Sequence, residues 1–182
     1  MIVLLTGFAS VYCQTSTRSD YVWVSIGGGF FDGNYSNGLC RYGSIDWSMK
    51  KVVETASGSK HRNNTLRFRG IKYSEMVGED YNGSLNDFGL LYGKTFGNVF
   101  QFSILAGIGV LGGWDRVIIP HGPTTPPTYL DKRYSTLNIP LELGIGLIPS
   151  KYVGISLGGF ANFNSKKSMI GLNLKLEFGK IR

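Results

Sequence analysis

The stretch Ile170-Gly-Leu-Asn-Leu-Lys-Leu-Glu-Phe178 decides the fold class of this chain. Every even position in it is large and apolar, and every odd position is small or polar. Because a β-strand sends successive side chains to opposite faces, this segment forms a strand with one apolar face and one charged face. Several other segments repeat the pattern, and no amphipathic helix is predicted that could cover their apolar faces. The alternation therefore favours a membrane-spanning β-barrel, with lipid outside and polar groups inside.

Eight segments are predicted to be strands, and most have the roughly 9–11 residues that a tilted strand needs to cross the hydrocarbon. They are residues 21–31, 39–50, 65–73, 85–96, 100–111, 134–148, 152–163 and 170–178. No segment has the run of about 18 apolar residues that indicates a transmembrane helix. We therefore predict an all-β fold, an eight-stranded antiparallel up-and-down transmembrane β-barrel. It forms a single domain over residues 14–182, and residues 1–13, which are nearly all apolar, are predicted to be a signal peptide.

The connections between these segments predict the orientation of the barrel. Tight turns at Gly97-Asn98 and Pro149-Ser150 fall at one end, and a long link at residues 112–133 falls at the other. Bacterial barrels have short periplasmic turns and longer outer loops. The pattern predicts an outer-membrane protein of a Gram-negative bacterium with its N-terminus in the periplasm. The link at residues 51–64 does not fit, because it is predicted to be periplasmic and yet is long.

The composition agrees with a barrel in a membrane. The chain has 26 glycines and 13% aromatic residues, and its net charge is +7. The basic residues are scattered and many fall in predicted connections, so we expect membrane phosphates rather than nucleic acid as their partner. Aromatic residues near the predicted strand ends suggest two interfacial belts. They are Phe30, Phe31, Phe88, Trp114, Tyr134 and Phe163 at the outer side, and Tyr21, Trp47, Phe96, Phe100, Tyr152 and Phe178 at the periplasmic side.

Seven ionisable residues fall on the predicted inward faces. They are Asp46, Arg67, Arg69, Asp87, Glu142, Lys175 and Glu177. Eight strands enclose an interior just wide enough to be filled by side chains. Because unpaired buried charges are strongly unfavourable, we expect these residues to form a salt-bridged plug. The alternative is an ion path through a narrow pore.

No catalytic, cofactor or metal site is predicted. Residues 107–112 match the G-x-G-x-x-G pattern, but the glycines, tryptophan and prolines that follow cannot begin the helix that a nucleotide site requires. The two histidines, His61 and His121, lie in connections on opposite sides of the membrane. A hydrolase would need His121 near Asp115 or Asp131, and a proline-rich loop is a poor scaffold for that geometry.

The outer connections are the predicted contact surface. The link at residues 112–133 contains four prolines, which reduce the entropy lost on binding, and its candidate contact residues are Trp114, Asp115, Arg116 and His121. Lys166 and Lys167 in the last outer loop are expected to face lipopolysaccharide phosphates, or else to be a solvated pair. The simpler interpretation of residues 112–133 is a loop that only covers the mouth of the barrel.

The chain resembles the small eight-stranded outer-membrane barrels of the OmpA/OmpX-like class, and more narrowly the uncharacterised outer membrane β-barrel proteins of Gram-negative bacteria. The resembling segments are residues 87–93, 139–142, 159–164 and 171–180. The resemblance implies a monomer in contact with outer-membrane lipid and lipopolysaccharide, inserted by the barrel-assembly machinery. The chain departs from the usual assembly signal by ending in Gly179-Lys180-Ile181-Arg182 instead of in an aromatic residue.

Three functions remain open from the sequence. The first is a non-enzymatic surface barrel with a side-chain-filled lumen and a structural or adhesive role through its outer loops. The second is a narrow pore for small solutes or ions. The third is a soluble, lipocalin-like carrier of a small hydrophobic ligand, which requires an apolar interior and a polar exterior.

Overall fold

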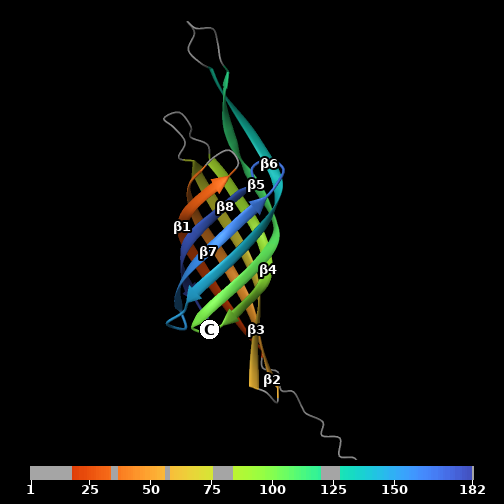
Figure 1. Cartoon of the computed structure of the whole chain (residues 1–182), viewed down its shortest axis with the longest axis vertical. Coiled ribbons are helices and arrows are strands. Elements are labelled where there is room, and N and C mark those ends of the chain that lie inside the picture. The colour runs from red at the N-terminus through yellow and green to blue at the C-terminus, as the bar shows by residue number, and fades with distance from the viewer. Residues whose placement is uncertain (1–17, 34–36, 56–57, 76–83, 120–127, 182) are drawn as a thin grey trace, which may run out of the picture.

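The computed structural model describes residues 18–33, 37–55, 58–75, 84–119 and 128–181, with side chains for 20–33, 37–49, 63–74, 84–114 and 133–181. These residues form eight strands that pair antiparallel in sequence order, and β1 pairs with β8 to close a barrel (Figure 1). The strands are β1 (Arg18–Gly33), β2 (Asn37–Thr55), β3 (Gly58–Glu75), β4 (Ser84–Gly97), β5 (Phe100–Ile119), β6 (Thr128–Leu147), β7 (Val153–Phe163) and β8 (Met169–Gly179). The prediction of an eight-stranded up-and-down barrel is confirmed. Within the described ranges, no helix is long and apolar enough to cross a membrane.

The strand register fixes the tilt of the barrel. Partners followed once around the sheet from Tyr21 on β1 return to β1 at Phe31, ten residues further along. This stagger is the shear of the barrel, and for eight strands it corresponds to a tilt of about 40°. The interior that results is narrow, so side chains from opposite strands can touch.

The alternation of side chains agrees with the prediction on every strand. On β8 the even positions 170–178 are 43–64% exposed, whereas Asn173, Lys175 and Glu177 are at most 5% exposed. On β6, all six outward positions from Leu137 to Leu147 are large, aliphatic and exposed. With a tilt of about 40°, ten residues rise about 25 Å, which is the height of the apolar band of outer-membrane barrels.

The two ends of the barrel differ. At the upper end in Figure 1, β1 connects to β2, β3 to β4, β5 to β6 and β7 to β8. At the lower end lie the β2–β3, β4–β5 and β6–β7 connections and the C-terminus (Figure 1). The tight turns predicted at Gly97-Asn98 and Pro149-Ser150 both fall at this lower end.

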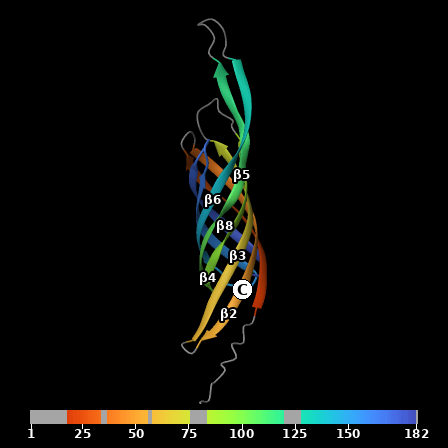
Figure 2. The ribbon, with the colours of Figure 1, turned by 90° about the vertical axis from the view of Figure 1, so that its right-hand side faces the viewer.

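The predicted loop at residues 112–133 is largely a β-hairpin. Strand β5 continues to Ile119 and β6 begins at Thr128, and these two residues are register partners. Residues 117–119 and 128–130 are mostly β-branched or aromatic, types that favour strands. The four prolines lie within residues 120–127, outside the described residues, so none interrupts the paired part of the hairpin. The extended hairpin rises above the rest of the barrel (Figures 1 and 2).

The prediction of a long connection at residues 51–64 was wrong, because the strands continue into this segment as they do in the β5–β6 hairpin. Strand β2 continues to Thr55, β3 begins at Gly58, and the two residues are partners. Val52, Val53 and Thr55 are β-branched and extend the ladder instead of ending it. The hairpin projects below the barrel, as both views show (Figures 1 and 2).

Three aromatic residues expected in the interfacial belts face the lumen instead. Phe31 was expected at the outer interface together with Phe30. Because neighbouring residues of a strand face opposite sides, Phe30 is 68% exposed on the outer face and Phe31 is 3% exposed in the lumen. Tyr134 and Tyr21 are half-buried and pack against the buried clusters at the upper and lower ends of the lumen.

The β4–β5 turn requires glycine at position 97. Gly97 has φ of +92°, and a Cβ there would clash with the carbonyl oxygen of Phe100. We expect Gly97→Ala to lower the free energy of unfolding by about 1–3 kcal/mol. Urea titration of the refolded barrel followed by tryptophan fluorescence measures the change. The matched control is Gly43→Ala, where the nearest atom, Ser25 O, lies 4.0 Å from the added Cβ. Equal losses in the two variants would contradict the role of the turn.

Candidate functional site

All seven ionisable residues that the sequence assigned to the inward face lie in the lumen. Each is at most 5% exposed, and they come from β2, β3, β4, β6 and β8. Asp46, Arg67, Arg69, Asp87, Glu142 and Lys175 form one linked set of ion pairs. Among the seven, three are cations and four are carboxylates.

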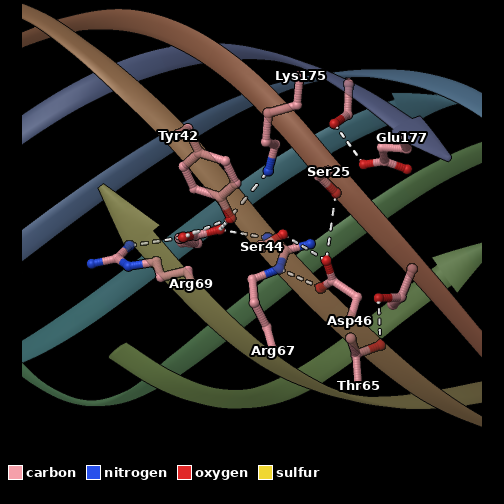
Figure 3. Close-up of polar contacts among 12 residues, drawn as sticks. Ser25, Tyr42, Ser44, Asp46, Thr65, Arg67, Arg69, Lys175 and Glu177 are labelled. Atoms are coloured by element: carbon pink, nitrogen blue, oxygen red, sulfur yellow. Dashed lines mark hydrogen bonds and ion pairs between the residues drawn. The ribbon is translucent and has the colours of Figure 1, made fainter. Parts of the chain in front are cut away.

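Glu142 on β6 is the centre of this network. Arg67 Nη1 lies 2.5 Å from Glu142 Oε2, and Arg69 Nη1 lies 2.7 Å from Oε1. The Tyr42 hydroxyl donates to the same carboxylate at 3.1 and 3.2 Å, and Lys175 Nζ lies 3.8 Å from Oε2. Figure 3 shows the side chains of Tyr42, Arg67, Arg69 and Lys175 meeting at this point. Side chains from three other strands, β2, β3 and β8, therefore converge on one carboxylate of β6 through charge-assisted contacts.

Asp46 completes the network on the side of Arg67. It accepts from Arg67 Nε, from Ser44 Oγ at 2.7 Å and from Ser25 Oγ at 3.5 Å (Figure 3). Each of its oxygens therefore has a donor, as a buried carboxylate requires.

Asp87 completes the network on the side of Arg69. It accepts from Arg69 Nη2 at 2.7 Å, Asn138 Nδ2 at 2.6 Å and Asn162 Nδ2 at 3.0 Å. Asn162 also accepts from Arg69 and donates to the Tyr73 hydroxyl at 2.5 Å. Strands β3, β4, β6 and β7 are therefore joined around this second carboxylate.

Glu177 lies nearer the lower end than the other carboxylates. It accepts a hydrogen bond from Ser156 Oγ at 2.7 Å. A polar cavity of about 20 Å³ lies beside it, lined among others by Lys175, Arg67 and Trp23. This volume holds about one water molecule.

Apolar side chains fill the lumen above the network, which the sequence did not predict. Phe31 and Tyr73 pack edge to face with their ring centroids 4.9 Å apart, and Phe160 lies 6.1 Å from Tyr73. The buried cluster contains Phe31, Cys40, Tyr42, Ile71, Tyr73, Leu85, Leu111, Phe160 and Met169. A smaller cluster of Trp23, Ile148 and Ile181 lies at the lower end. The lumen is therefore layered, with charges between two apolar caps.

The uncharged partners of the network were also missed. Tyr42, Asn138 and Asn162 form hydrogen bonds with lumenal charges, and Tyr73 accepts a hydrogen bond from Asn162. Their inward positions follow from the strand alternation, so the signal was present in the sequence. Only the register shows which charge each of them reaches.

The outer contact residues are described only in part. Trp114 is half-buried at the upper end, and the side chains of Asp115 and Arg116 and all of His121 lie outside the described part of the chain. Lys166 is exposed. Lys167, expected to face phosphates, is only 9% exposed, and its ammonium lies 5.8 Å from the ring centroid of Tyr134.

The network has the chemistry of a structural element. Its carboxylates and cations pair with one another, which favours one geometry, and Arg69 Nε is the one guanidinium nitrogen of the described network that is buried without a hydrogen-bond partner. No group of three or more His, Cys, Asp or Glu residues among the described residues could hold a metal ion. A second hollow, of about 940 Å³, is larger than the cavity beside Glu177 and lies on the outer apolar face around Ala106, Gly159 and Ala161.

The barrel thus has a charged interior and an apolar exterior. The lipocalin-like alternative requires the reverse, an apolar interior and a polar exterior.

Comparisons with known proteins show the fold. No protein-family model and no curated protein matches the chain. Ail, the attachment invasion locus protein of Yersinia pestis, superposes with a TM-score of 0.58 at 9% sequence identity, covering 89% of this chain and 97% of Ail. Ail in complex with the heparin analogue sucrose octasulfate gives 0.59 at 8% identity with the same coverage. Neisserial surface protein A gives 0.54 at 8% identity, covering 89% of this chain and 98% of that protein.

These structures are small outer-membrane β-barrels, and the match spans nearly their whole length. The chain therefore has the fold of the small eight-stranded outer-membrane β-barrels. At identities of 8–9%, the likeness extends to the fold and not to a ligand or partner.

The hub role of Glu142 can be tested by Glu142→Gln. The amide leaves Arg67, Arg69 and Lys175 without their shared countercharge, so we expect a loss of about 3–5 kcal/mol in the free energy of unfolding. Urea titration of the refolded barrel in lipid vesicles measures it. Glu177→Gln is the matched control, because this carboxylate accepts from Ser156 and borders the small cavity. A loss after Glu142→Gln no larger than that of the control would contradict the central position of Glu142.

Proposed function

We propose that the protein is a non-enzymatic outer-membrane barrel that presents contact surfaces at its upper end on a filled, rigid scaffold. It resides in the outer membrane of a Gram-negative bacterium, with the upper end outside and the lower end in the periplasm. The observation that carries the proposal is that the same barrel has a lumen packed with side chains and a β5–β6 hairpin that extends beyond its upper end. The scaffold holds the hairpin in place, and the hairpin supplies the contacts.

The packing of the lumen supports a scaffold rather than a conduit. The upper apolar cluster lies directly above the charged network, and Tyr42 belongs to both. The cavity beside Glu177 has room for about one water molecule. An ion crossing the lumen would have to displace both the apolar cluster and the ion pairs around Glu142.

The β5–β6 hairpin supports a role in surface contact. Strand β4 pairs with β5 only as far as Trp114, and β7 pairs with β6 only from Ile139 onward. Beyond these points, the hairpin has two strand edges without a neighbouring strand among the described residues. Such edges offer backbone donors and acceptors to another chain. Trp114, Asp115, Arg116 and His121 belong to this hairpin and its connection, and they remain our proposed contact residues.

The comparisons support the same class of function. One similar structure is named an attachment invasion protein and was also solved with a heparin analogue, and another is named a surface protein. We propose attachment through the hairpin, with Lys166 contacting lipopolysaccharide phosphates beside it. The protein acts as a monomer that the barrel-assembly machinery inserts.

Shortening the hairpin tests this function. Replacing residues 115–132 by Asn-Gly joins the register partners Trp114 and Arg133 through a two-residue turn. We expect the variant to remain in the outer membrane and to keep a boiling-dependent shift on SDS gels. Binding of expressing cells to host-cell monolayers and to immobilised heparin should fall at least about tenfold, measured by plate counts.

The control shortens the lower hairpin in the same way, by replacing residues 52–61 with Asn-Gly. We expect it to leave attachment unchanged, because that hairpin lies at the opposite end of the barrel. Unchanged attachment after removal of the upper hairpin would overturn the proposed contact surface. A soluble protein without a boiling shift would overturn the outer-membrane location.

Planar-bilayer recordings distinguish the scaffold from the narrow pore. Because apolar and charged layers fill the lumen, we expect the purified barrel to give no stepwise currents in 1 M KCl. The boiling shift of the same preparation verifies that the protein is folded. Reproducible single-channel steps from the folded barrel would contradict the filled lumen and favour the pore.

A further inference from the structure

Two cations lie side by side on the outer wall of the barrel. Arg41 on β2 and Lys72 on β3 are register partners, and both side chains are exposed. Each is followed by a tyrosine, Tyr42 or Tyr73, that is buried in the lumen, so the two cations point outward. No carboxylate in the described part of the chain forms an ion pair with either of them. We refer to Arg41 and Lys72 as the cation pair.

The cation pair lies inside the apolar band, close to its upper border. Leu39 is 40% exposed and is the last apolar residue on the outward face of β2, two residues above Arg41. Two residues rise about 5 Å at this tilt. Register partners rise about 3 Å from one strand to the next, because a full circuit of the sheet climbs about 25 Å. Arg41 and Lys72 therefore lie about 5 and 2 Å below the level of Leu39. Long basic side chains at this depth reach the headgroup region by extending upward.

The cation pair is unfavourable unless an anion covers it. Like charges directly opposite on neighbouring strands destabilise a sheet, and a cation that faces hydrocarbon is costly. Among the described outward side chains of the upper half, the one carboxylate is Asp32. Asp32 is the register partner of Asn37, which lies four residues, or about 13 Å, along β2 from Arg41. An anionic group from outside the barrel would remove both penalties.

The wall directly below the cation pair carries no side chain. Gly43 and Gly70 are register partners and are the next outward positions on β2 and β3. A Cβ at Gly43 would have its nearest neighbour at 4.0 Å, and one at Gly70 at 3.5 Å, so packing within the barrel does not require glycine at either position. The two glycines are bordered by the exposed side chains of Ile26, Ile45, Phe68 and Phe88. A hydrocarbon chain can therefore lie against the backbone below the two charges.

We propose that Arg41 and Lys72 bind a phosphate of lipid A in the upper leaflet, with one acyl chain lying over Gly43 and Gly70. Two adjacent cations match a phosphate monoester, which carries nearly two negative charges at neutral pH. Lipid A carries its phosphates as monoesters, whereas a phospholipid such as phosphatidylglycerol has a diester with a single charge. The proposal rests on the proposed function for the location of the upper end in the outer leaflet. It adds a lipid site on the barrel wall that is separate from the contact hairpin.

The test compares two charge-matched double variants with the wild type. Arg41→Gln/Lys72→Gln removes the cation pair. Lys94→Gln/Lys151→Gln removes two exposed cations that are not neighbours, because Lys94 lies on β4 and Lys151 in the β6–β7 connection. Each full-length protein is refolded in nanodiscs of phosphatidylcholine with a small fraction of either lipid A or phosphatidylglycerol, and its boiling shift verifies folding. Native mass spectrometry measures the lipid A or phosphatidylglycerol retained per barrel.

We expect the wild type to retain lipid A in preference to phosphatidylglycerol. Loss of the cation pair should reduce the retained lipid A about 25-fold, since each cation near the membrane surface contributes about fivefold. The control should change less than about twofold. Gly43→Leu keeps both cations but covers the bare wall, so it should also retain less lipid A than the wild type.

An unchanged Arg41→Gln/Lys72→Gln variant, or equal losses in the two double variants, would overturn the proposal. Equal retention of the two lipids by the wild type would overturn the assignment to lipid A. Unchanged retention by Gly43→Leu would overturn the position of the acyl chain. The nanodisc has identical leaflets and presents no host surface, so a failure here is distinguishable from a failure of the attachment function.

Discussion

The carboxylate of Glu142 is the constraint on which the lumen depends. Closing eight strands with this shear brings Arg67 and Arg69, at successive inward positions of β3, to one glutamate on the far side of the barrel. An unpaired charge in so narrow a space is strongly unfavourable, so the two arginines, Lys175 and Glu142 require one another. Asp46 forms a second ion pair with Arg67, and Asp87 forms a second ion pair with Arg69. The network thereby favours a single register for strands that are far apart in the sequence.

Much of the fold could be predicted from the sequence, because strand alternation in a membrane is a strong local signal. The even positions of β8 and the aliphatic positions of β6 are outward as expected, and the seven ionisable residues are inward. The contacts inside could not be predicted, because they depend on the shear. Tyr42, Asn138 and Asn162 each form a hydrogen bond with a particular charged residue. These pairings are fixed only when the sheet closes into the barrel. The two hairpins were missed because β-branched residues extended the strands past the apolar band.

Different parts of the barrel have different surroundings. In the lumen, an apolar cluster covers the ion pairs from above. In the proposed function, the upper hairpin presents its strand edges for contact with a partner. The proposed contact surface therefore stands on a barrel whose described lumen is filled by side chains.

The most direct test of this account is a double-mutant cycle between Arg69 and Glu142, with each replaced by methionine singly and together. Urea unfolding of the four proteins in vesicles gives the coupling free energy. We predict coupling of at least about 1.5 kcal/mol, because each single variant leaves a buried charge and the double variant removes both. Additive effects would show that the two groups act independently. That result would contradict the claim that the Glu142 network holds the barrel.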